Sequence, residues 1–419
     1  MRAVNREFIY VTASAGLPAL GNFVAVTLAL HHLDPVLLGR SYALLALLYV
    51  AIDAFNFGSS RIYTIERIRA RFASLIRLDA ISATASTMLF CIACWVLGRS
   101  DTIIIPHWPV MLVLAPACYG LSHFSLGFFR IFRKSIVVCV VSTVSALSRV
   151  SVVILLIEIR DWRPLLPDFL LLIEAAYGAM LLGCYLWFRR SVAGQVEPQR
   201  AEDNRGIFGW YRHFFSHARD EVLSSWYANA IFSGAKHVDV LIVSVLVGPA
   251  GAALYRAVKS INNLAFNFGQ SLSLAMHGSW IVVAEAFREN AVRRRLALCA
   301  IVSIAILIAA SYGLLKVKLF PTSSLGSETA QWGFLFAVLS GALLVLLCRI
   351  VSLYLYACSK TAFVKMSSME VIVTLGAVSL LGWKMGVGGA VSGVGIASFA
   401  ILLSSAFLLI RVGERSVTA

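Results

Sequence analysis

Long apolar stretches, separated by short polar and basic segments, run through almost the whole chain. A helix needs about 20 mostly apolar residues to cross the hydrocarbon core of a bilayer. On that measure the sequence predicts twelve membrane-spanning helices, numbered spans one to twelve, at residues 8–30, 37–58, 78–97, 110–129, 135–157, 168–188, 222–247, 252–283, 296–315, 330–355, 367–383 and 387–410. We therefore expect an all-α, polytopic membrane protein, in which a short Gly-rich turn separates the last two spans.

Polar side chains gather on one face of span eight. Their spacing of three, four or seven residues keeps them on the same side of a helix, while the other sides are apolar. They are Arg256, Lys259, Asn263, Asn267, Gln270 and His277. A similar set in span seven comprises Asn229, Ser233, Lys236 and His237. A cation that faces lipid at the bilayer centre costs roughly 2.5–3.5 kcal/mol, so we expect these residues to line a water-filled cavity. A cationic cavity inside the membrane favours the passage of an anion.

The composition supports a membrane protein. Of the 419 residues, 59% are hydrophobic and 14% are charged, whereas soluble domains have about half and about a quarter. The net charge of +15 would also suit a nucleic-acid-binding protein, but the arginines lie in short loops between apolar stretches, so we expect no nucleic-acid partner. The basic start, MRAVNREFIY, is similar to that of a signal peptide. Because a long apolar stretch without a small-residue cleavage site follows, we interpret it as a retained first span.

Redox chemistry, metal binding and ATP hydrolysis have little support in the sequence. The eight cysteines are scattered and mostly lie inside spans. Cys91 and Cys94 form a CxxC pair, but no cluster of Cys or His accompanies it. A phosphate-binding GxxxxGK[ST] loop is absent from the sequence. We predict no metal site and no cofactor.

The distribution of basic residues predicts the orientation in the membrane. Most of the 36 Lys and Arg residues fall in alternate loops, on the side that also holds both termini. Since positively charged loops stay in the cytoplasm, we expect both the N- and the C-terminus to be cytoplasmic. The loops on the opposite side are short, which leaves no room for an outer catalytic domain.

A long cytoplasmic segment divides the chain into two halves. We predict a six-helix lobe at 1–190, a linker at 191–221 and a second six-helix lobe at 222–419. The first half of the linker is polar, whereas its second half, IFGWYRHFFSHARDE, is aromatic and basic. This second half fits either a helix lying in the membrane interface or a positively charged tether between the lobes, and the tether is the simpler interpretation.

The two halves share a loop motif. The loop after span one reads LDPVLLGRSYALL, and the loop after span seven reads LVGPAGAALYRAV. Each places a Tyr six or seven positions after a Pro, at the start of the next span, namely Pro35 with Tyr42 and Pro249 with Tyr255. Two halves of equal topology are a common transporter design, with the substrate site between them.

These motifs resemble those of the polysaccharide flippases (O-antigen or exopolysaccharide, Wzx-type) in the MATE-like multidrug/oligosaccharidyl-lipid/polysaccharide exporter superfamily. The family's first-half pattern, L-G-P-x-x-F/Y-G and then D-x-G, is similar to Leu33-Asp34-Pro35 with Gly39 and Tyr42, and to the stretch from Asp53 to Gly58. The second-half pattern, L-G-P-x-x-x-G-x-Y, is similar to Val247-Gly248-Pro249 with Tyr255. In topology the resemblance covers the whole chain.

The resemblance implies two six-helix lobes around a central cavity, and a transporter rather than an enzyme. The implied activity is to flip an undecaprenyl-pyrophosphate-linked oligosaccharide across the bacterial inner membrane for cell-surface polysaccharide synthesis. The implied partners are this lipid-linked glycan, membrane lipid, and the polymerase and export proteins of the same polysaccharide. No catalytic residue is expected.

The candidate substrate-binding residues are mainly cations. Arg and Lys pair with pyrophosphate, and amide side chains hydrogen-bond sugar hydroxyls. We therefore assign substrate binding in the cationic cavity to Arg256, Lys259, Lys236, Arg149, Arg61, Asn263, Asn267 and Gln270.

Each of these cations has a second interpretation. Arg256 and Lys259 lie in the first turns of span eight and could extend to the outer interface instead. Lys236 could pair with Asp239, three residues further on. Asp239 is then a charge partner, and both interpretations of Lys236 could hold together.

The two cations of the first half also have two interpretations each. Arg149 could pair with a carboxylate of a nearby span, such as Glu174. Arg61 could be the first cytoplasmic contact of the pyrophosphate, or an ordinary cytoplasmic arginine of the kind that the positive-inside rule predicts.

Other candidates concern coupling and gating. Asp53, a carboxylate inside span two, could couple transport to a proton or cation gradient, or pair with a cation; the membrane potential is a further energy source. Pro18 should kink span one and could form a gate. His123 and His277 could titrate near neutral pH, or simply be packing residues.

Two other functions compete with the flippase. A cation-coupled drug or metabolite exporter of the same superfamily would usually need an acidic cavity, whereas the cavity residues here are mainly basic. A membrane-embedded acyltransferase or glycosyltransferase is the alternative from another class. His31-His32-Leu33-Asp34 does not have the HxxxD spacing of acyltransferases, and the short outer loops offer no pair of adjacent acids.

Overall fold

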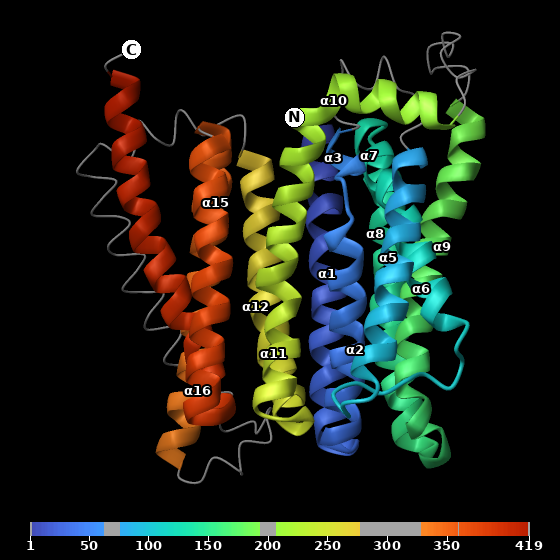
Figure 1. Cartoon of the computed structure of the whole chain (residues 1–419), viewed down its shortest axis with the longest axis vertical. Coiled ribbons are helices and arrows are strands. Elements are labelled where there is room, and N and C mark those ends of the chain that lie inside the picture. The colour runs from blue at the N-terminus through green and yellow to red at the C-terminus, as the bar shows by residue number, and fades with distance from the viewer. Residues whose placement is uncertain (1, 63–75, 193–206, 277–327, 359, 418–419) are drawn as a thin grey trace. The chain divides into compact units, whose positions relative to one another are not determined.

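The computed structural model describes residues 2–62, 76–192, 207–276, 328–358 and 360–417 (Figure 1). Helices make up most of these residues, and no β-strand occurs among them. Seven stretches of the described chain are long and apolar enough to cross a membrane: Pro35–Ala54, Ile76–Leu97, Met111–Ile131, Ser135–Glu158, Arg160–Arg190, Gln331–Cys348 and Val364–Ser405. The all-α, multi-pass membrane fold predicted from the sequence is therefore confirmed.

The helices group into two compact units. Unit 1 comprises Met1–Pro18 and Arg40–Leu241, and unit 2 comprises Ala19–Gly39 and Ile242–Ala419. Helices α1 (Arg2–His32) and α2 (Pro35–Ala54) therefore contribute to both units. The lobe boundaries predicted at 190 and 221 were placed at the polar linker in the sequence, whereas the two units are defined by which helices pack together. The predicted boundaries therefore stay a prediction.

Unit 1 holds most of the described residues of predicted spans two to seven, while the start of α2 and the end of span seven belong to unit 2. Besides α2, its helices are α3 (Ser59–Ile62), α5 (Ile76–Leu97), α6 (Met111–Leu121), α7 (His123–Ile131), α8 (Ser135–Glu158), α9 (Leu166–Val192) and α10 (Ile207–Ser233). A 3-10 helix, Arg160–Leu165, leads into α9, and a π-helical turn, Gly234–Val238, joins α10 to α11 (Asp239–Leu246).

Span four is not one continuous helix. It breaks at Ser122 into α6 and α7. The carboxylate of Asp79 on α5, which is 2% exposed, accepts a hydrogen bond of 2.5 Å from the backbone N–H of Phe124 in the first turn of α7. The first N–H groups of a helix have no partner within the helix, and a carboxylate is favourable there. Asp79 thus stabilises the start of α7.

Unit 2 holds the described helices of spans eight and ten to twelve. They are α12 (Pro249–Met276), α15 (Glu328–Cys358) and α16 (Lys360–Val417), joined by the second part of α1. Span nine, residues 296–315, and the end of span eight lie outside the described residues.

The Gly-rich turn predicted between spans eleven and twelve lies within α16. Gly386 has φ 62° and ψ −146° there, a conformation that is essentially restricted to glycine. The chain on the two sides of this turn packs antiparallel: a Cβ at Gly382 would lie 3.4 Å from the Cβ of Ala390, and one at Gly393 would lie 2.9 Å from the carbonyl oxygen of Ala377. The element is thus a helical hairpin.

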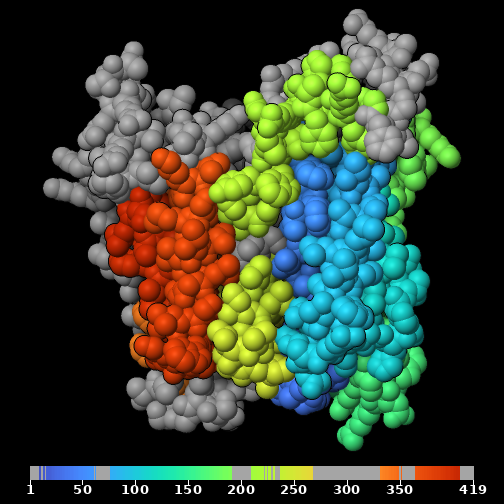
Figure 2. All heavy atoms as spheres, viewed as in Figure 1, coloured from blue at the N-terminus to red at the C-terminus, as the bar shows by residue number. Residues whose placement is uncertain are grey.

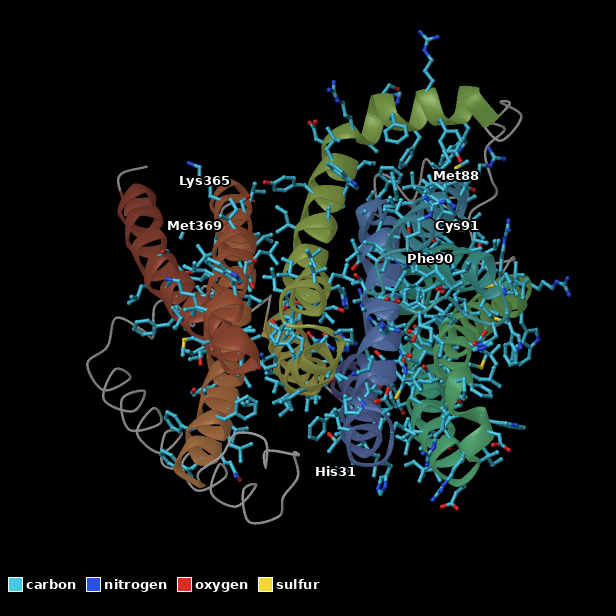
Figure 3. The ribbon with its side chains drawn as sticks, turned by 60° about the horizontal axis from the view of Figure 1, so that its bottom comes forward. His31, Met88, Phe90, Cys91, Lys365 and Met369 are labelled. Atoms are coloured by element: carbon cyan, nitrogen blue, oxygen red, sulfur yellow. The ribbon has the colours of Figure 1, made fainter. Side chains whose placement is uncertain are left out.

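Helix α5 has the side-chain pattern of a helix in contact with lipid (Figure 3). Phe90 and Cys94 are buried, whereas Met88, Ile92 and Trp95 are 64%, 61% and 64% exposed. Large apolar side chains exposed along one side of a helix are unusual on soluble proteins. They match the hydrocarbon of a bilayer.

The first part of α10 packs across one end of unit 1. Trp210, Phe214 and Ala218 are 4%, 0% and 0% exposed and belong to the same apolar core as Phe124 and Phe128 of α7. Figure 1 shows this part of α10 across the ends of α3 and α7, and Figure 2 shows it in yellow-green over the blue and cyan segments. The backbone at Ala218 is non-helical, with φ −125° and ψ 16°.

Residues 207–221 are therefore part of a helix that packs on the core of unit 1, and their role as a tether between the lobes stays a prediction. The buried side chains of this segment recur every four residues, which forms an apolar stripe on a helix. Tyr211 adds a polar contact to α5, because its hydroxyl donates a hydrogen bond of 2.6 Å to the carbonyl of Arg77. Burial raises the pKa of Tyr211, so the hydroxyl keeps its proton at neutral pH. Residues 193–206, the rest of the linker, lie outside the described chain.

Candidate functional site

The two loop motifs of the internal repeat begin their helices in the same way. Pro35 is the first residue of α2, and Pro249 is the first residue of α12. Proline suits this position, because its fixed φ fits a helix and its missing N–H would have no partner. Before Pro35, the carboxylate of Asp34 accepts a hydrogen bond of 2.8 Å from Leu37 N–H. Before Pro249, Gly248 adopts φ 94°.

These two loops touch each other within unit 2. A Cβ added at Gly39 would overlap the backbone carbonyl of Pro249. The glycine is needed because any other residue would push the loops apart. The tyrosines of the motifs, Tyr42 and Tyr255, are 1% and 0% exposed. The repeat predicted from the sequence thus corresponds to a close contact in the fold.

The two cations at the start of α12 are buried in unit 2. Arg256 is 3% exposed and Lys259 is 5% exposed, so neither extends to the outer interface in the way that snorkelling requires. A hydrogen-bond chain runs beside them: Asn22 of α1 donates to Ser260 Oγ at 2.8 Å, and Ser260 Oγ donates to the Arg256 carbonyl at 2.9 Å. Both cations are thus buried among the described residues of unit 2, and the water-filled cavity expected around them stays a prediction.

The amides predicted on the same face are less enclosed. Asn263 and Asn267 are half-buried on α12. Gln270 lies on α12, but its side chain is not among those described. His277 lies outside the described residues. Sequence reasoning missed Asn22, Ser260 and Asn262, which are buried polar residues of unit 2. Their serine and asparagine side chains are ordinary residues of a membrane helix, so only the packing identifies them.

Arg149 is the centre of a second polar group, in unit 1. Its guanidinium, 8% exposed on α8, forms a buried ion pair with Glu174 of α9. The same Nη2 atom donates a hydrogen bond of 3.3 Å to the hydroxyl of Tyr49 on α2. Glu174, which the second interpretation of Arg149 named as a possible partner, is thus its partner in the structure.

Aromatic rings from five elements form a connected group beside this ion pair, which they join through Tyr49. The Tyr49 ring lies 4.8 Å from the His237 ring and 5.9 Å from the Tyr119 ring, measured between centroids. The Tyr119 ring lies 5.7 Å from the Tyr177 ring and 5.5 Å from the His123 ring. The three tyrosines are half-buried, so a group of hydroxyls and ring faces adjoins Arg149. We call Arg149, Glu174 and these five rings the Arg149 cluster. Tyrosines scattered over three spans gave no sequence signal.

Lys236 lies on the π-helical turn that interrupts span seven. The turn, Gly234–Val238, carries Lys236 and His237, and His237 is half-buried. Asp239 directly follows it, is fully buried, and accepts a hydrogen bond of 2.8 Å from Val240 N–H. Single π-helical turns inside α-helices often occur at functional sites. Lys236 is half-buried as well. Nothing is described of the side chains of Asn229 and Ser233.

The remaining candidates lie at helix ends or inside α1. Asp53 is half-buried in the last turn of α2, and Arg61 lies on α3 with a side chain outside the description. Pro18 is within α1, which continues through it as one helix. The division between the two units falls directly after Pro18.

Two deeply buried carboxylates were missed by the sequence analysis, and both stabilise backbone. One is Asp79, which binds the start of α7 as described above. The other is Asp168 on α9, fully buried, which accepts hydrogen bonds from the backbone N–H groups of His107 at 3.1 Å and Trp108 at 2.6 Å. Their partners are 45 and about 60 residues away in the chain, so no local sequence pattern predicts these contacts.

Metal ligands do not come together in the part of the chain that the structure describes. No group of three or more His, Cys, Asp or Glu side chains could hold a metal ion there. Cys91 and Cys94 are free thiols on α5, and Cys91 Sγ donates a weak hydrogen bond of 3.7 Å to the carbonyl of Leu112.

Comparison with known proteins identifies the fold. No model of a known protein family matches the sequence, and no curated protein matches it. Solved structures do match. A eukaryotic MATE transporter, AtDTX14, aligns with a TM-score of 0.56 and 13% identity over 97% of this chain and 95% of its own. A mutant of the MATE transporter VcmN of Vibrio cholerae aligns with a TM-score of 0.56 and 11% identity over 98% and 99%.

A third neighbour is a MOP-superfamily transporter from Pyrococcus furiosus. It aligns with a TM-score of 0.54 and 13% identity over 98% of this chain and 96% of its own. The polarity of its binding pocket is described as reversed, which suggests a different function for it. The chain therefore has the fold of the MATE transporters of the MOP superfamily. These neighbours are transporters and not enzymes.

Proposed function

We propose that this protein flips an undecaprenyl-pyrophosphate-linked oligosaccharide from the cytoplasmic to the periplasmic leaflet of the bacterial inner membrane. The observation that carries the proposal is the burial of three cations, Arg149, Arg256 and Lys259, in helices of a transporter fold. Ionisable residues inside the membrane are rare and often mark the pathway of a substrate or an ion. A carrier of pyrophosphate needs such cations, whereas a carrier of cationic drugs does not.

In this proposal, the two ends of the substrate headgroup bind to different side chains. Arg256 and Lys259 from α12 are the proposed contacts of the pyrophosphate, Arg149 from α8 is a further candidate contact within its own unit, and the planar fork of Arg suits phosphate oxygens. Asn263 and Asn267 hydrogen-bond sugar hydroxyls, as does Gln270 further along α12. The polyprenyl chain stays in the lipid, because it is as apolar as the bilayer.

Alternating access completes the proposed cycle. One lobe moves against the other and opens the cationic cavity to each side in turn. Pro18 is the candidate gate, because a proline inside a helix removes a backbone hydrogen bond and weakens the helix locally. Lys236 and Asp239 lie at the π-helical turn of span seven and are the corresponding candidates there. Arg61 is proposed as the first cytoplasmic contact.

The energy source and the partners belong to the same proposal. Asp53 is a candidate for coupling to a proton or cation gradient, and the membrane potential would also act on an anionic substrate. Both termini are proposed to be cytoplasmic, because the basic loops lie on their side. The polymerase and export proteins of the polysaccharide are the proposed partners.

One structural neighbour supports the choice of an anionic substrate. The Pyrococcus furiosus transporter combines this fold with a binding pocket of reversed polarity. A likeness of fold carries no substrate with it. The neighbour does support the idea that a binding site of a different charge in this fold carries a different kind of substrate.

A cation-coupled exporter of drugs or metabolites is the second candidate function. The tyrosine rings of the Arg149 cluster favour it, because aromatic faces bind cationic and apolar molecules. The two candidates differ in the charge of the cargo, so an experiment that follows the lipid-linked glycan separates them.

The test follows lipid-linked glycan in cells that lack the protein. Undecaprenyl-linked sugars are labelled, and a membrane-impermeant glycan-modifying probe reports the leaflet that holds them. We expect complete repeat units to remain on the cytoplasmic side. The wild-type protein should restore their transfer, and a variant with Arg256→Ala and Lys259→Ala should not.

The matched control replaces two exposed cations, Arg212→Ala with Lys365→Ala, and should restore transfer fully. If repeat units reach the periplasm normally in the deletion strain and only polymer length or decoration changes, the flippase is wrong and an enzyme is favoured. Normal glycans together with altered drug sensitivity would establish the exporter instead.

A further inference from the structure

The Arg149 cluster has hydrogen-bonding groups that its own contacts do not use. The guanidinium of Arg149 donates through Nη2 to the hydroxyl of Tyr49, at 3.3 Å, and to Oε1 of Glu174. Among the described residues, Arg149 Nε and Nη1 and Glu174 Oε2 have no hydrogen-bond partner. A guanidinium has five N–H donors and a carboxylate has about four acceptor positions. The pair therefore has donors and acceptors left over, side by side.

A sugar hydroxyl needs this combination, because each hydroxyl is a donor and an acceptor at once. The guanidinium and the carboxylate are also planar groups that hold two neighbouring hydroxyls in a fixed geometry. Arg149 is 8% exposed and Glu174 is 1% exposed, and a buried polar group that lacks a partner is costly. The unused groups of the pair thus fit a ligand with several hydroxyls.

The tyrosines of the cluster supply the second part of a sugar site. Tyr49, Tyr119 and Tyr177 come from α2, α6 and α9, and their ring centroids lie 5.9 Å and 5.7 Å apart in that order. All three are half-buried, so part of each ring remains accessible. The C–H groups on the faces of a pyranose carry a small positive charge, and the face of an aromatic ring is negative. A pyranose therefore stacks on such a ring.

We propose that the Arg149 cluster binds the sugar that is attached directly to the pyrophosphate, and that this sugar is a hexopyranose. One face of the sugar lies on a tyrosine ring, and its hydroxyls bond to the unused groups of Arg149 and Glu174. The inference rests on the proposed function, since it takes the cargo to be a lipid-linked glycan. Arg149 is also a candidate contact of the pyrophosphate, and for this reason the adjoining sugar is the one assigned to the cluster.

The charges of the cluster favour a sugar over a cationic drug at these rings. Aromatic faces attract both. A cationic drug needs an excess of negative charge, whereas the cluster pairs one carboxylate with one guanidinium, Glu174 with Arg149. Hydroxyl groups need no net charge. The sequence proposed amides of α12, in unit 2, as contacts of the glycan, and the Arg149 cluster adds a contact in unit 1.

The experiment compares probes with and without a sugar on the purified full-length protein. The probe without a sugar is farnesyl pyrophosphate, and three further probes carry one glucose, galactose or N-acetylglucosamine on its terminal phosphate. Isothermal titration calorimetry measures the four affinities. We expect at least one of the sugar-bearing probes to bind about tenfold more tightly than farnesyl pyrophosphate, which corresponds to one or two net hydrogen bonds.

Variants locate the sugar. Leucine replaces Tyr49, Tyr119 and Tyr177 in turn, and at least one of these variants should lose most of the gain that the sugar brings while it binds farnesyl pyrophosphate as the wild type does. The corresponding Tyr→Phe variant keeps the ring and should keep most of the gain. Tyr211→Leu is the matched control, because Tyr211 is a half-buried tyrosine of unit 1 outside the cluster. A purely structural role of the tyrosines would change the affinity for all four probes together.

The outcomes separate the inference from the proposed function. Equal affinity for farnesyl pyrophosphate and for all three sugar-bearing probes overturns the inference and leaves the proposed function standing, as does a gain that survives in all three leucine variants. No binding of any probe overturns both. If the leucine variants do not fold, the wild type is cross-linked to a probe with a diazirine on its sugar. Labelling of the cluster's residues supports the inference, and labelling confined to other residues overturns it.

Discussion

The backbone of Gly39 lies directly against the carbonyl group of Pro249, so that a Cβ at residue 39 would overlap this carbonyl. The two residues belong to loop motifs that are 210 positions apart in the sequence and similar to each other. A glycine at this point allows the start of α2 and the start of α12 to approach to backbone contact. The repeat is therefore a packing relationship of unit 2 as well as a pattern in the sequence.

Replacement of Gly39 by alanine should destabilise the protein although alanine is the better helix former. The added methyl group overlaps backbone, which cannot move aside as a flexible side chain would, so we expect a loss of about 1–3 kcal/mol. Thermal unfolding in detergent measures it. Gly333→Ala is the control, because nothing lies within 4 Å of a Cβ at that position of α15. An unchanged melting temperature for Gly39→Ala would mean that the two loops are not in contact.

Asp79 should contribute to the stability of the protein. Replacement by leucine leaves the N–H of Phe124 buried without a partner, at a cost of about 1–3 kcal/mol. Asp79→Asn keeps an acceptor oxygen and should cost less. The same thermal unfolding experiment compares them, with Asp220→Leu as the control on the exposed surface of α10. Equal melting temperatures for the leucine variants at 79 and 220 would contradict the role of Asp79.

The membrane helices could be predicted because their signal is local. Twenty apolar residues in sequence are enough for a span, and Pro and Gly mark the turns, as Gly386 does within α16. The stripe of Trp210, Phe214 and Ala218 is also local, but the same residues suited either a helix in the membrane interface or a tether between the lobes. It was the packing against α7, which the sequence does not display, that decided in favour of a helix in the core.

The polar contacts could not be predicted, because they join residues far apart in the chain. Arg149 meets Tyr49 across 100 positions, and Asp79 meets Phe124 across 45. A local pattern cannot tell which of several carboxylates an arginine will meet. The pair with Glu174 was foreseen as one possibility, since both residues are charges inside neighbouring spans that need compensation. The roles of the candidate site residues in transport stay predictions.

The first part of α10 should contribute to the stability of unit 1. Trp210 is 4% exposed, so Trp210→Ala should cost about 3–5 kcal/mol through lost burial and a cavity. Trp187, which is 72% exposed on α9, provides the matched control: Trp187→Ala removes the same side chain from a site outside the core. Limited proteolysis and thermal unfolding check both variants. A Trp210→Ala protein as stable as Trp187→Ala would show that this packing does not contribute to stability.

The ion pair of Arg149 and Glu174 allows stability and transport to be separated. Arg149→Leu leaves a buried carboxylate without its cation, and Glu174→Leu leaves a buried guanidinium, so each single variant should lose about 3–5 kcal/mol. The double variant removes both charges, and its stability should return to within about 1 kcal/mol of the wild type, as apolar pairs in buried sites often do. Thermal unfolding in detergent measures all three.

Transport should not return in the double variant, because the cation proposed to bind pyrophosphate is gone. The leaflet assay for lipid-linked repeat units measures this, and Arg212→Ala, an exposed cation on α10, is the control that keeps transport. A double variant that is stable and also transfers repeat units at the wild-type rate would show that the pair serves packing alone. A double variant that is stable and inactive would separate the function of Arg149 from its contribution to the fold, because folding would then be intact without the charge that the substrate requires.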